Sequence, residues 1–92
     1  MQAKMWNNSA WIAETNPSKI KAMFDAILHE CGFTILECTE HYFSPQGYTA
    51  LYLLSESHFA IHTFPEFGKS YIELSSCNME YYLHYLELTK RM

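Results

Sequence analysis

The sequence predicts a single α+β domain in two layers, an antiparallel sheet with two helices on one face. The chain has 92 residues, of which 49% are hydrophobic and 16% aromatic, a content typical of one folded domain rather than a disordered chain. Two segments carry apolar residues at helical spacing, and five short segments rich in β-forming residues lie between turn sequences. The expected order of elements is β-α-β-β-β-β-α.

The first half of the chain predicts a strand over residues 10–15 and then a helix. Asn16 and Pro17 are typical of a helix start, with Asn as the N-cap and Pro in the first turn. Gly32 is expected to end this helix. Apolar residues recur between these limits at offsets of three and four, which predicts one buried face: Ile20, Met23, Phe24, Ile27, Leu28 and Cys31.

The second half predicts four strands and a second helix. The strand segments are residues 33–43, 48–54, 57–64 and 70–76. Turn sequences at 45–47 and 65–68 favour antiparallel pairing of the strands they join. Asn78 is expected to cap the last helix, whose apolar residues are Met79, Tyr82, Leu83 and Leu86.

Helices on one face would leave the other face of the sheet uncovered. A two-layer domain buries only one side of its sheet, and a chain this small has a modest core of its own. A second copy of the chain is the simplest cover, so we expect a homodimer.

Composition excludes several classes of function. The formal net charge is −4 and the six Lys and Arg form no patch, which argues against nucleic acid as a partner. No apolar run is long enough to span a bilayer, and Met1 to Asn8 lack the pattern of a signal peptide. Three widely spaced cysteines without a CxxC pair predict neither a disulfide framework nor a zinc site. A cytoplasmic protein is therefore expected, with no metal and no dissociable cofactor.

Residues 55–68 read Ser-Glu-Ser-His-x-x-Ile-His-Thr-x-Pro-Glu-x-Gly. On residue types alone this is a strand with hydroxyls and histidines, which most often has a solvated polar face. The run resembles the self-processing segment of bacterial and archaeal S-adenosylmethionine decarboxylases. Residues 41–47, His-Tyr-Phe-Ser-Pro-Gln-Gly, resemble a second segment of that family, and Cys77 lies twenty residues beyond Ser57, at the spacing of its catalytic cysteine. The chain is therefore identified as a member of this pyruvoyl-dependent proenzyme family.

The resemblance implies that the chain cuts itself between Glu56 and Ser57. The hydroxyl of Ser57 would attack the Glu56 carbonyl, and elimination from the resulting ester would leave a pyruvoyl group at position 57. The products would be a β chain, 1–56, and an α chain, 57–92. His62 matches the base that removes the α-proton of the serine, a task that suits histidine because it titrates near neutral pH. Thr49 stands where the family usually has a serine whose hydroxyl assists processing.

The resemblance also implies a decarboxylase that acts on S-adenosylmethionine in spermidine biosynthesis. The covalent pyruvoyl group derived from Ser57 would form a Schiff base with the substrate amine and accept the electrons freed as CO2 leaves. Cys77 would return a proton to the substrate carbon, since an ordinary thiol is mostly protonated at neutral pH. Phe43 would stack on the adenine and Glu66 would hold the ribose hydroxyls. In the family this pocket lies near the interface between two subunits.

Strand geometry sets a condition on the pair Ser57 and His62. They are five residues apart, so an unbroken strand would point them to opposite faces. The mechanism therefore predicts a break in the strand around residues 55–58. A regular strand through 54–63, with the two side chains on opposite faces, would count against His62 as the base.

Two other functions remain open on the sequence. Some proteins that resemble this family decarboxylate arginine or ornithine with the same chemistry; Phe43 favours the adenine-bearing substrate, whereas shortened ends favour a smaller one. The second alternative is an unprocessed, non-catalytic regulatory subunit. Asn8 to Trp11 do not match the strand that opens familiar members, and Asn78 follows Cys77 where the family usually has glycine.

Overall fold

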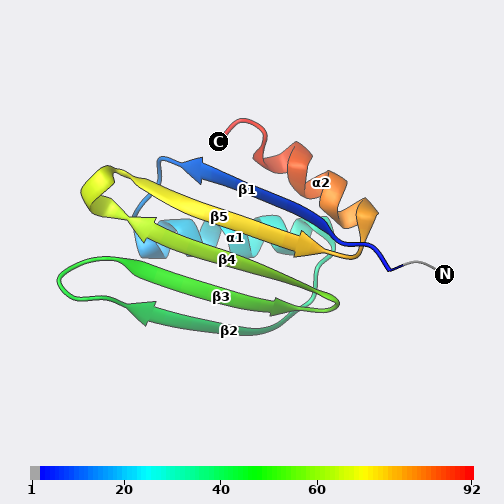
Figure 1. Cartoon of the computed structure of the whole chain (residues 1–92), viewed down its shortest axis with the longest axis horizontal. Helices are drawn as coiled ribbons and strands as arrows, with labels where there is room; N and C mark the ends of the chain where they lie inside the picture. The colour runs from blue at the N-terminus through cyan, green and yellow to red at the C-terminus, as the bar shows by residue number, and fades with distance from the viewer. Residues whose placement is uncertain (1–2) are drawn as a thin grey trace.

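The structure, a computed structural model, describes residues 3–92 as one sheet and two main helices (Figure 1). The elements, in chain order, are β1 (Trp6–Ile12), α1 (Pro17–Cys31), β2 (Ile35–Tyr42), β3 (Tyr48–Leu54), β4 (Ser57–Phe64), the short 3-10 helix η1 (Pro65–Phe67), β5 (Lys69–Ser76) and α2 (Met79–Thr89). The sheet order is β1-β5-β4-β3-β2, and every neighbouring pair is antiparallel. The predicted fold class and element order are confirmed.

The helix ends follow the predicted capping chemistry. The Asn16 side chain accepts the backbone N–H of Lys19, and the Asn78 side chain accepts that of Tyr81, so each satisfies a donor that the first turn leaves free. Gly32 ends α1 in the left-handed region at φ 107°. A Cβ at this glycine would lie 2.8 Å from the Tyr81 ring, so the close approach of α1 to α2 also requires glycine.

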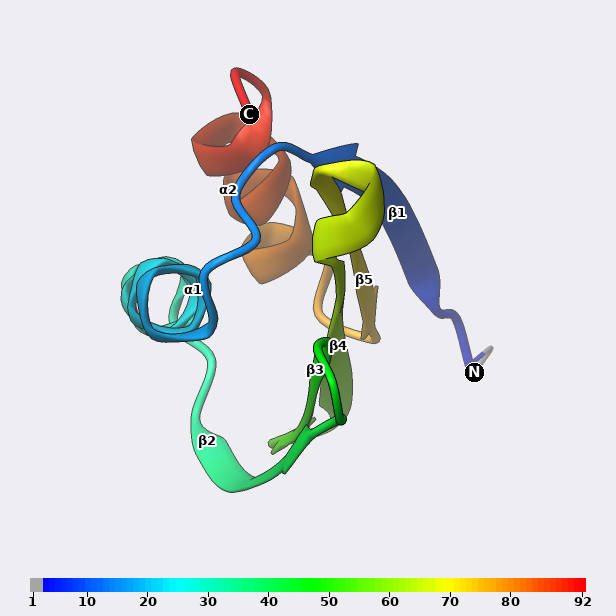
Figure 2. The ribbon, with the colours of Figure 1, turned by 90° about the vertical axis from the view of Figure 1, so that its left-hand side faces the viewer.

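Both helices cover the same face of the sheet (Figure 2). Alternate residues of the central strands point into the layer between them, where Phe24 of α1 stacks on Phe59 of β4 at 5.0 Å between ring centroids. Tyr85 of α2 contacts the same Phe59 ring at 6.0 Å. An aromatic cluster within the core therefore holds both helices against β4.

Two predicted details are wrong. The first strand was predicted over 10–15 but runs over Trp6–Ile12, because the Glu14 carboxylate accepts the N–H groups of Thr15 and Asn16 and turns the chain there. The apolar face of α2 was predicted to include Met79 and Leu83, yet both are half exposed, and Tyr85 is the residue of α2 that is fully buried. Packing against an aromatic core overrides the aliphatic periodicity.

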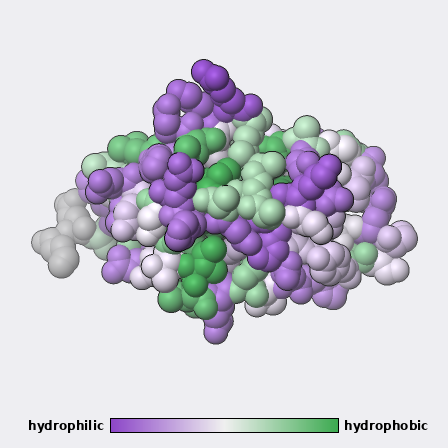
Figure 3. Space-filling model, turned by 180° about the vertical axis from the view of Figure 1, so that it is seen from behind, coloured by the Kyte–Doolittle hydropathy of each residue, from purple (hydrophilic) through white to green (hydrophobic). Residues whose placement is uncertain are grey.

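The face of the sheet opposite the helices, called the open face below, is not covered by a second layer from residues 3–92 (Figure 2). Trp11, Leu51 and Leu53 point to this side and are each 51% exposed. The helix-covered side of the molecule is mostly hydrophilic, with separate hydrophobic patches (Figure 3). The open face thus presents large apolar side chains of the kind that mark an interaction surface.

We predict that Phe24→Ala lowers the free energy of unfolding by about 3–5 kcal/mol, because it removes a fully buried ring from the aromatic core. Phe67→Ala is the matched control: this ring, in η1, is 71% exposed, and its loss should change the free energy by less than about 0.5 kcal/mol. Urea denaturation at one protein concentration measures both. Equal denaturation midpoints for the two variants would contradict the described core.

Candidate functional site

The turn between β3 and β4 carries the bond at which cleavage is predicted. β3 ends at Leu54 and β4 begins at Ser57, so Ser55 and Glu56 form a two-residue connection. Glu56 has φ 63°, the single non-glycine residue with positive φ among residues 3–92. The left-handed region costs a residue with a side chain about 1 kcal/mol or more, so this turn holds Glu56 in a strained conformation. The strand breaks at residues 55–56, within the predicted range, but β4 is regular from Ser57 onward, so the break does not turn Ser57 to the face that carries His62.

The pairing of β4 with β5 places both Ser57 and Cys77 next to this turn. Ser57 is paired in register with Ser76, the last residue of β5, and Cys77 follows. The Ser57 hydroxyl donates to Ser76 Oγ at 2.9 Å, and both side chains are buried. The Cys77 thiol donates to the backbone carbonyl oxygen of Glu56 at 2.9 Å. The predicted cleavage serine and the predicted proton donor therefore share one end of the sheet, called the cleavage end below.

Thr49 and His62 meet on the open face. They are register partners in β3 and β4, and Thr49 Oγ1 lies 3.1 Å from His62 Nδ1. The same cross-strand row continues to Tyr71 and Trp11, whose rings lie 5.2 Å apart edge to face, while the His62 and Tyr71 ring centroids are 6.3 Å apart. The row thus holds a hydroxyl against the imidazole on one side and an aromatic wall on the other.

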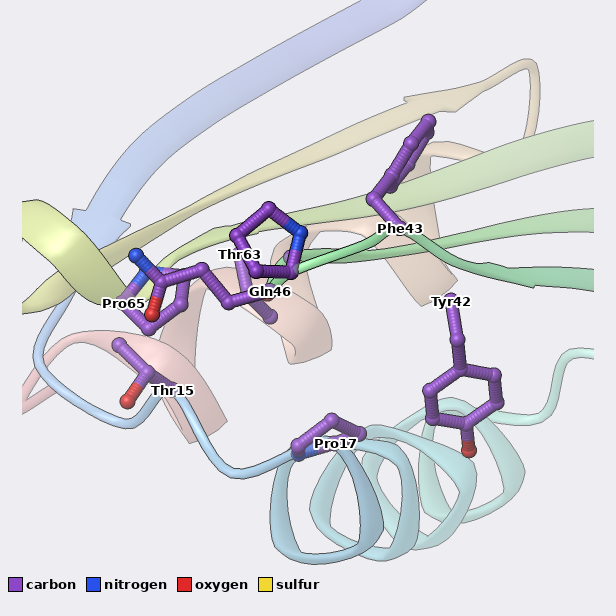
Figure 4. A pocket seen from close by; sticks show the side chains of 9 residues that line it. Thr15, Pro17, Tyr42, Phe43, Gln46, Thr63 and Pro65 are labelled. Atoms are coloured by element: carbon purple, nitrogen blue, oxygen red, sulfur yellow. The ribbon is translucent and has the colours of Figure 1, made fainter.

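Phe43 lies at the end of the same row. It directly follows β2, is 51% exposed and contacts the His41 ring at 4.4 Å between centroids; His41 is in turn the register partner of Thr49. Tyr42 and Phe43 point in opposite directions, Tyr42 toward α1 and Phe43 away from it (Figure 4). Phe43 also borders a cavity of about 300 Å³ at this end of the molecule.

Glu66 lies close to this cavity in the chain but does not line it. It is an exposed residue of η1, and its neighbour Pro65 is the residue of this turn that borders the cavity together with Phe43. The structure therefore places an exposed aromatic ring and an exposed carboxylate near the end of the sheet where β4 ends. This end, with Phe43, Thr49, His62 and Glu66, is called the His62 end below.

Within one chain the His62 end and the cleavage end are separate. From Ser57 onward β4 is regular, so Ser57 points toward the helices and His62 toward the open face. Five residues of strand also separate them by about 17 Å. His62 of a given chain therefore does not contact its own Ser57.

Two features of the site were not predicted from the sequence. Ser76 contacts Ser57 only because β4 and β5 pair in this register, and Tyr71 and Trp11 flank His62 through the same pairing. Residue spacing along one strand carries no signal for contacts across strands. A register derived from the turn Pro65–Gly68 could have identified Ser76.

Chemistry outside these two ends is limited. Across residues 3–92, no group of three His, Cys, Asp or Glu side chains could hold a metal ion. In the same range no helix is long and apolar enough to cross a membrane. Between α1 and β3, Asp25 accepts the Tyr52 hydroxyl at 2.6 Å and pairs with Lys21 at 2.7 Å, and burial together with this hydrogen bond raises the pKa of Tyr52. This cluster ties α1 to the sheet.

Comparison with known proteins shows which family shares this fold. Residues 8–88 match the family of S-adenosylmethionine decarboxylase. The S-adenosylmethionine decarboxylase proenzyme of Methanococcus maripaludis strain C7 is 36% identical over 74 residues, 80% of this chain and 60% of that protein. The proenzyme of Brevibacillus brevis is 47% identical over 57 residues, 62% of this chain and 42% of that protein. This chain thus spans about 60% or less of the length of these relatives.

A solved structure agrees with this relationship. The crystal structure of the adenosylmethionine decarboxylase from Aquifex aeolicus superposes with a TM-score of 0.72 at 18% identity, covering 98% of this chain and 83% of that one. At this identity the likeness shows the fold: a two-layer α+β protein of the adenosylmethionine decarboxylase type. With the match over residues 8–88, the chain belongs to the S-adenosylmethionine decarboxylase family.

We predict that iodoacetamide at pH 8 modifies Cys77 first and Cys31 last. The thiolate is the reacting form, and Cys77 is exposed. Burial raises the pKa of Cys31 from 9.0 to about 11, which reduces its thiolate at pH 8 by about a hundredfold before steric shielding is counted. Mass spectrometry of peptides over time measures the rates, and Cys77→Ser should remove the fast phase. A fast phase that survives in Cys77→Ser would contradict the exposed position of this thiol.

Proposed function

We propose that the chain is a self-processing, pyruvoyl-dependent decarboxylase that converts S-adenosylmethionine to its decarboxylated form and CO2, the aminopropyl donor of spermidine biosynthesis. One observation carries the proposal: the Cys77 thiol lies 2.9 Å from the carbonyl oxygen of Glu56, the residue that precedes Ser57. Self-cleavage would break the peptide bond between Glu56 and Ser57 and leave the pyruvoyl group at position 57 near the Cys77 thiol, which could then act as a proton donor. Membership of the decarboxylase family supports the same reading.

Self-processing would take place in the strained turn. Ser57 Oγ attacks the Glu56 carbonyl carbon; the C–O ester bond forms, the C–N peptide bond breaks, and the hydroxyl proton passes to the freed Ser57 nitrogen. The Cys77 S–H that donates to the Glu56 carbonyl stabilises the negative charge developing on this oxygen. Loss of the Ser57 α-proton then expels the Glu56 carboxylate and leaves dehydroalanine, whose hydrolysis releases ammonia and forms the pyruvoyl group.

The residues of the cleavage end fit a pyruvoyl group at position 57. The bound group supplies a carbonyl that captures the substrate amine and an electron sink for the electrons freed as CO2 leaves. Cys77, exposed beside the cleavage point, is placed to protonate the substrate carbon. At the His62 end, which would have to come from a second copy, Phe43 offers the adenine a half-exposed ring, and the Glu66 carboxylate can accept hydrogen bonds from ribose hydroxyls.

The active unit is a homodimer in which the two open faces pack together. His62 lies on the open face and cannot reach Ser57 of its own chain, whereas the exposed Cys77 lies at the other end of the sheet, beside the cleavage point. A two-fold axis between the sheets and perpendicular to the strands would place the His62 end of one copy over the cleavage end of the other. The half-exposed Trp11, Leu51 and Leu53 would be buried between the sheets.

We expect two fragments, residues 1–56 and 57–92, when the purified chain is measured by denaturing intact-mass spectrometry. The 57–92 fragment should carry no free amino terminus, because the nitrogen of Ser57 leaves as ammonia. Ser57→Ala should remain one chain, since it lacks the attacking hydroxyl. A wild-type chain that stays uncut through long incubation, like Ser57→Ala, would contradict self-processing and favour the regulatory-subunit function.

The processed protein then identifies the substrate. CO2 release should occur from S-adenosylmethionine and not from arginine or ornithine at equal concentrations. Release from arginine or ornithine instead would show that Phe43 does not serve as an adenine platform. Cys77→Ala, with CO2 release measured per cut chain, should lose most of the release because the proton donor is absent.

We predict that two inactive variants rescue each other if the site is shared between copies. His62→Ala lacks the base and Ser57→Ala lacks the nucleophile, so each alone should stay uncut. In a mixed dimer, Ser57 of the His62→Ala chain meets His62 of the Ser57→Ala chain. Co-expression should therefore cut the His62→Ala chain while the Ser57→Ala chain stays intact, which intact mass distinguishes. No cleavage of either chain in an isolated mixed dimer would contradict the shared site.

A further inference from the structure

Ser76 is a fully buried hydroxyl that the function proposed above does not use. Its Oγ accepts the Ser57 hydroxyl at 2.9 Å and the backbone N–H of Asn78 at 3.0 Å, and it donates to the Asn78 carbonyl at 3.3 Å. Its exposed fraction is 0% and that of Ser57 is 7%. A hydroxyl offers one donor and two acceptor sites, so these three bonds use its full capacity.

This bonding pattern holds Ser76 in one orientation. Two of its three partners are backbone groups of Asn78, the cap of α2, and therefore cannot rotate away. Because the site is buried, water cannot readily replace a lost bond, and an unpaired hydroxyl there costs about 1–3 kcal/mol. Ser76 Oγ is consequently a fixed hydrogen-bond acceptor for the Ser57 hydroxyl.

The orientation of Ser57 follows from that of Ser76. By donating its proton to Ser76, the Ser57 hydroxyl keeps its own lone pairs free of other donors described in the structure and directs its oxygen toward the helix side of the sheet. The peptide bond to be cut begins at the adjacent Glu56, whose carbonyl oxygen is already engaged by Cys77. Ser76 thus restrains the nucleophile, the Ser57 hydroxyl, on the helix side, and Cys77 polarises the Glu56 carbonyl.

We propose that Ser76 is a positioning residue for self-cleavage, which holds Ser57 Oγ on the helix side of β4 during the acyl shift and the elimination that follows. The inference rests on the function proposed above. In the acyl shift, Ser57 Oγ forms the ester bond to the carbonyl carbon of Glu56, and the hydroxyl proton passes to the Ser57 nitrogen when the C–N bond breaks. Ser76 gains and loses no atoms in either step.

The same restraint serves the elimination. This step breaks the Cβ–O bond while a base removes the α-proton, and it is fastest when oxygen and proton leave from opposite sides. With the oxygen held on the helix side, the α-proton is approached from the open face, where His62 of a second copy would lie. The opposite orientation of Ser57 and His62 in one chain is therefore suited to elimination across a dimer.

A pair of variants of equal shape tests the role of Ser76. Threonine keeps the hydroxyl and valine replaces it with a methyl group, so both add similar bulk at the buried position. The fraction of cut chain is followed over time by intact mass in freshly expressed protein. The cleavage rate of Ser76→Thr should lie within about threefold of the wild-type rate. Ser76→Val should cut at least tenfold more slowly than Ser76→Thr. Equal rates for the two variants would overturn the proposal.

Ser75→Ala is the control for a lost hydroxyl at the neighbouring position. Ser75 points to the open face and donates to the Asn7 side chain at 2.5 Å, without contact to Ser57. It should cut at close to the wild-type rate. A loss in Ser75→Ala equal to that in Ser76→Val would show a general effect of β5 packing and would overturn the specific role of Ser76.

Hydroxylamine separates the first step from the second. It cleaves an accumulated ester, so it should release fragments from His62→Ala, which is blocked at elimination. It should release few from Ser76→Val if the acyl shift itself is slowed. Rapid hydroxylamine cleavage of Ser76→Val would overturn the role in the acyl shift. If the wild type does not cut at all, the proposed function is refuted. If the wild type cuts but Ser76→Thr and Ser76→Val cut at equal rates, the Ser76 inference alone is refuted.

Discussion

The register between β4 and β5 is the constraint on which the site depends. It sets Ser57 opposite Ser76. Because the two strands are antiparallel, Glu56, which precedes Ser57, then lies beside Cys77, which follows Ser76. A shift by one residue would turn every side chain of β4 to the other face of the sheet. The aromatic packing of Phe59 against Phe24 and Tyr85 opposes such a shift, because it would move a buried ring to the open face. Core packing and site geometry are thus set by the same pairing.

The alternation of side chains along β4 divides the chemistry between two surfaces. Ser57 belongs to the buried layer and is reached by Ser76, whereas His62 belongs to the open face and is reached by Thr49. A single chain therefore carries the parts of a site without assembling them. This separation, together with the half-exposed apolar residues of the open face, is the physical reason for expecting the functional unit to contain two copies.

The strained turn at Glu56 links fold and chemistry. A hairpin connection of two residues requires an unusual backbone conformation, and here a glutamate rather than a glycine adopts it. Cleavage after Glu56 would release the turn and its strain together. Glu56 also lies near the Cys77 thiol through its side chain, with Oε2 at 3.8 Å from Sγ, so the local structure concentrates two acidic hydrogen-bonding groups at the bond in question.

The sequence by itself determined the elements, the fold class and the family. Asn16, Gly32 and Asn78 mark helix ends through chemistry within a few residues, and the turn sequences predict antiparallel pairing, so local rules suffice for these features. The break before Ser57 and the candidates Thr49 and His62 were likewise accessible from residue spacing and resemblance, although the contact between Thr49 and His62 was not. The start of β1 was not, because Asn7, Asn8 and Ser9 have low strand propensity and form a strand only by pairing with β5.

Only the tertiary structure decided which side chains meet across strands and helices. The contact of Ser76 with Ser57, the contact of Cys77 with the Glu56 carbonyl and the rotation of α2 that buries Tyr85 all join residues distant in the chain. Such contacts depend on register and on how large aromatic rings fill one shared core, and both are properties of the whole packing. Spacing along the chain determines which face a residue occupies within its own strand, but not what lies opposite it.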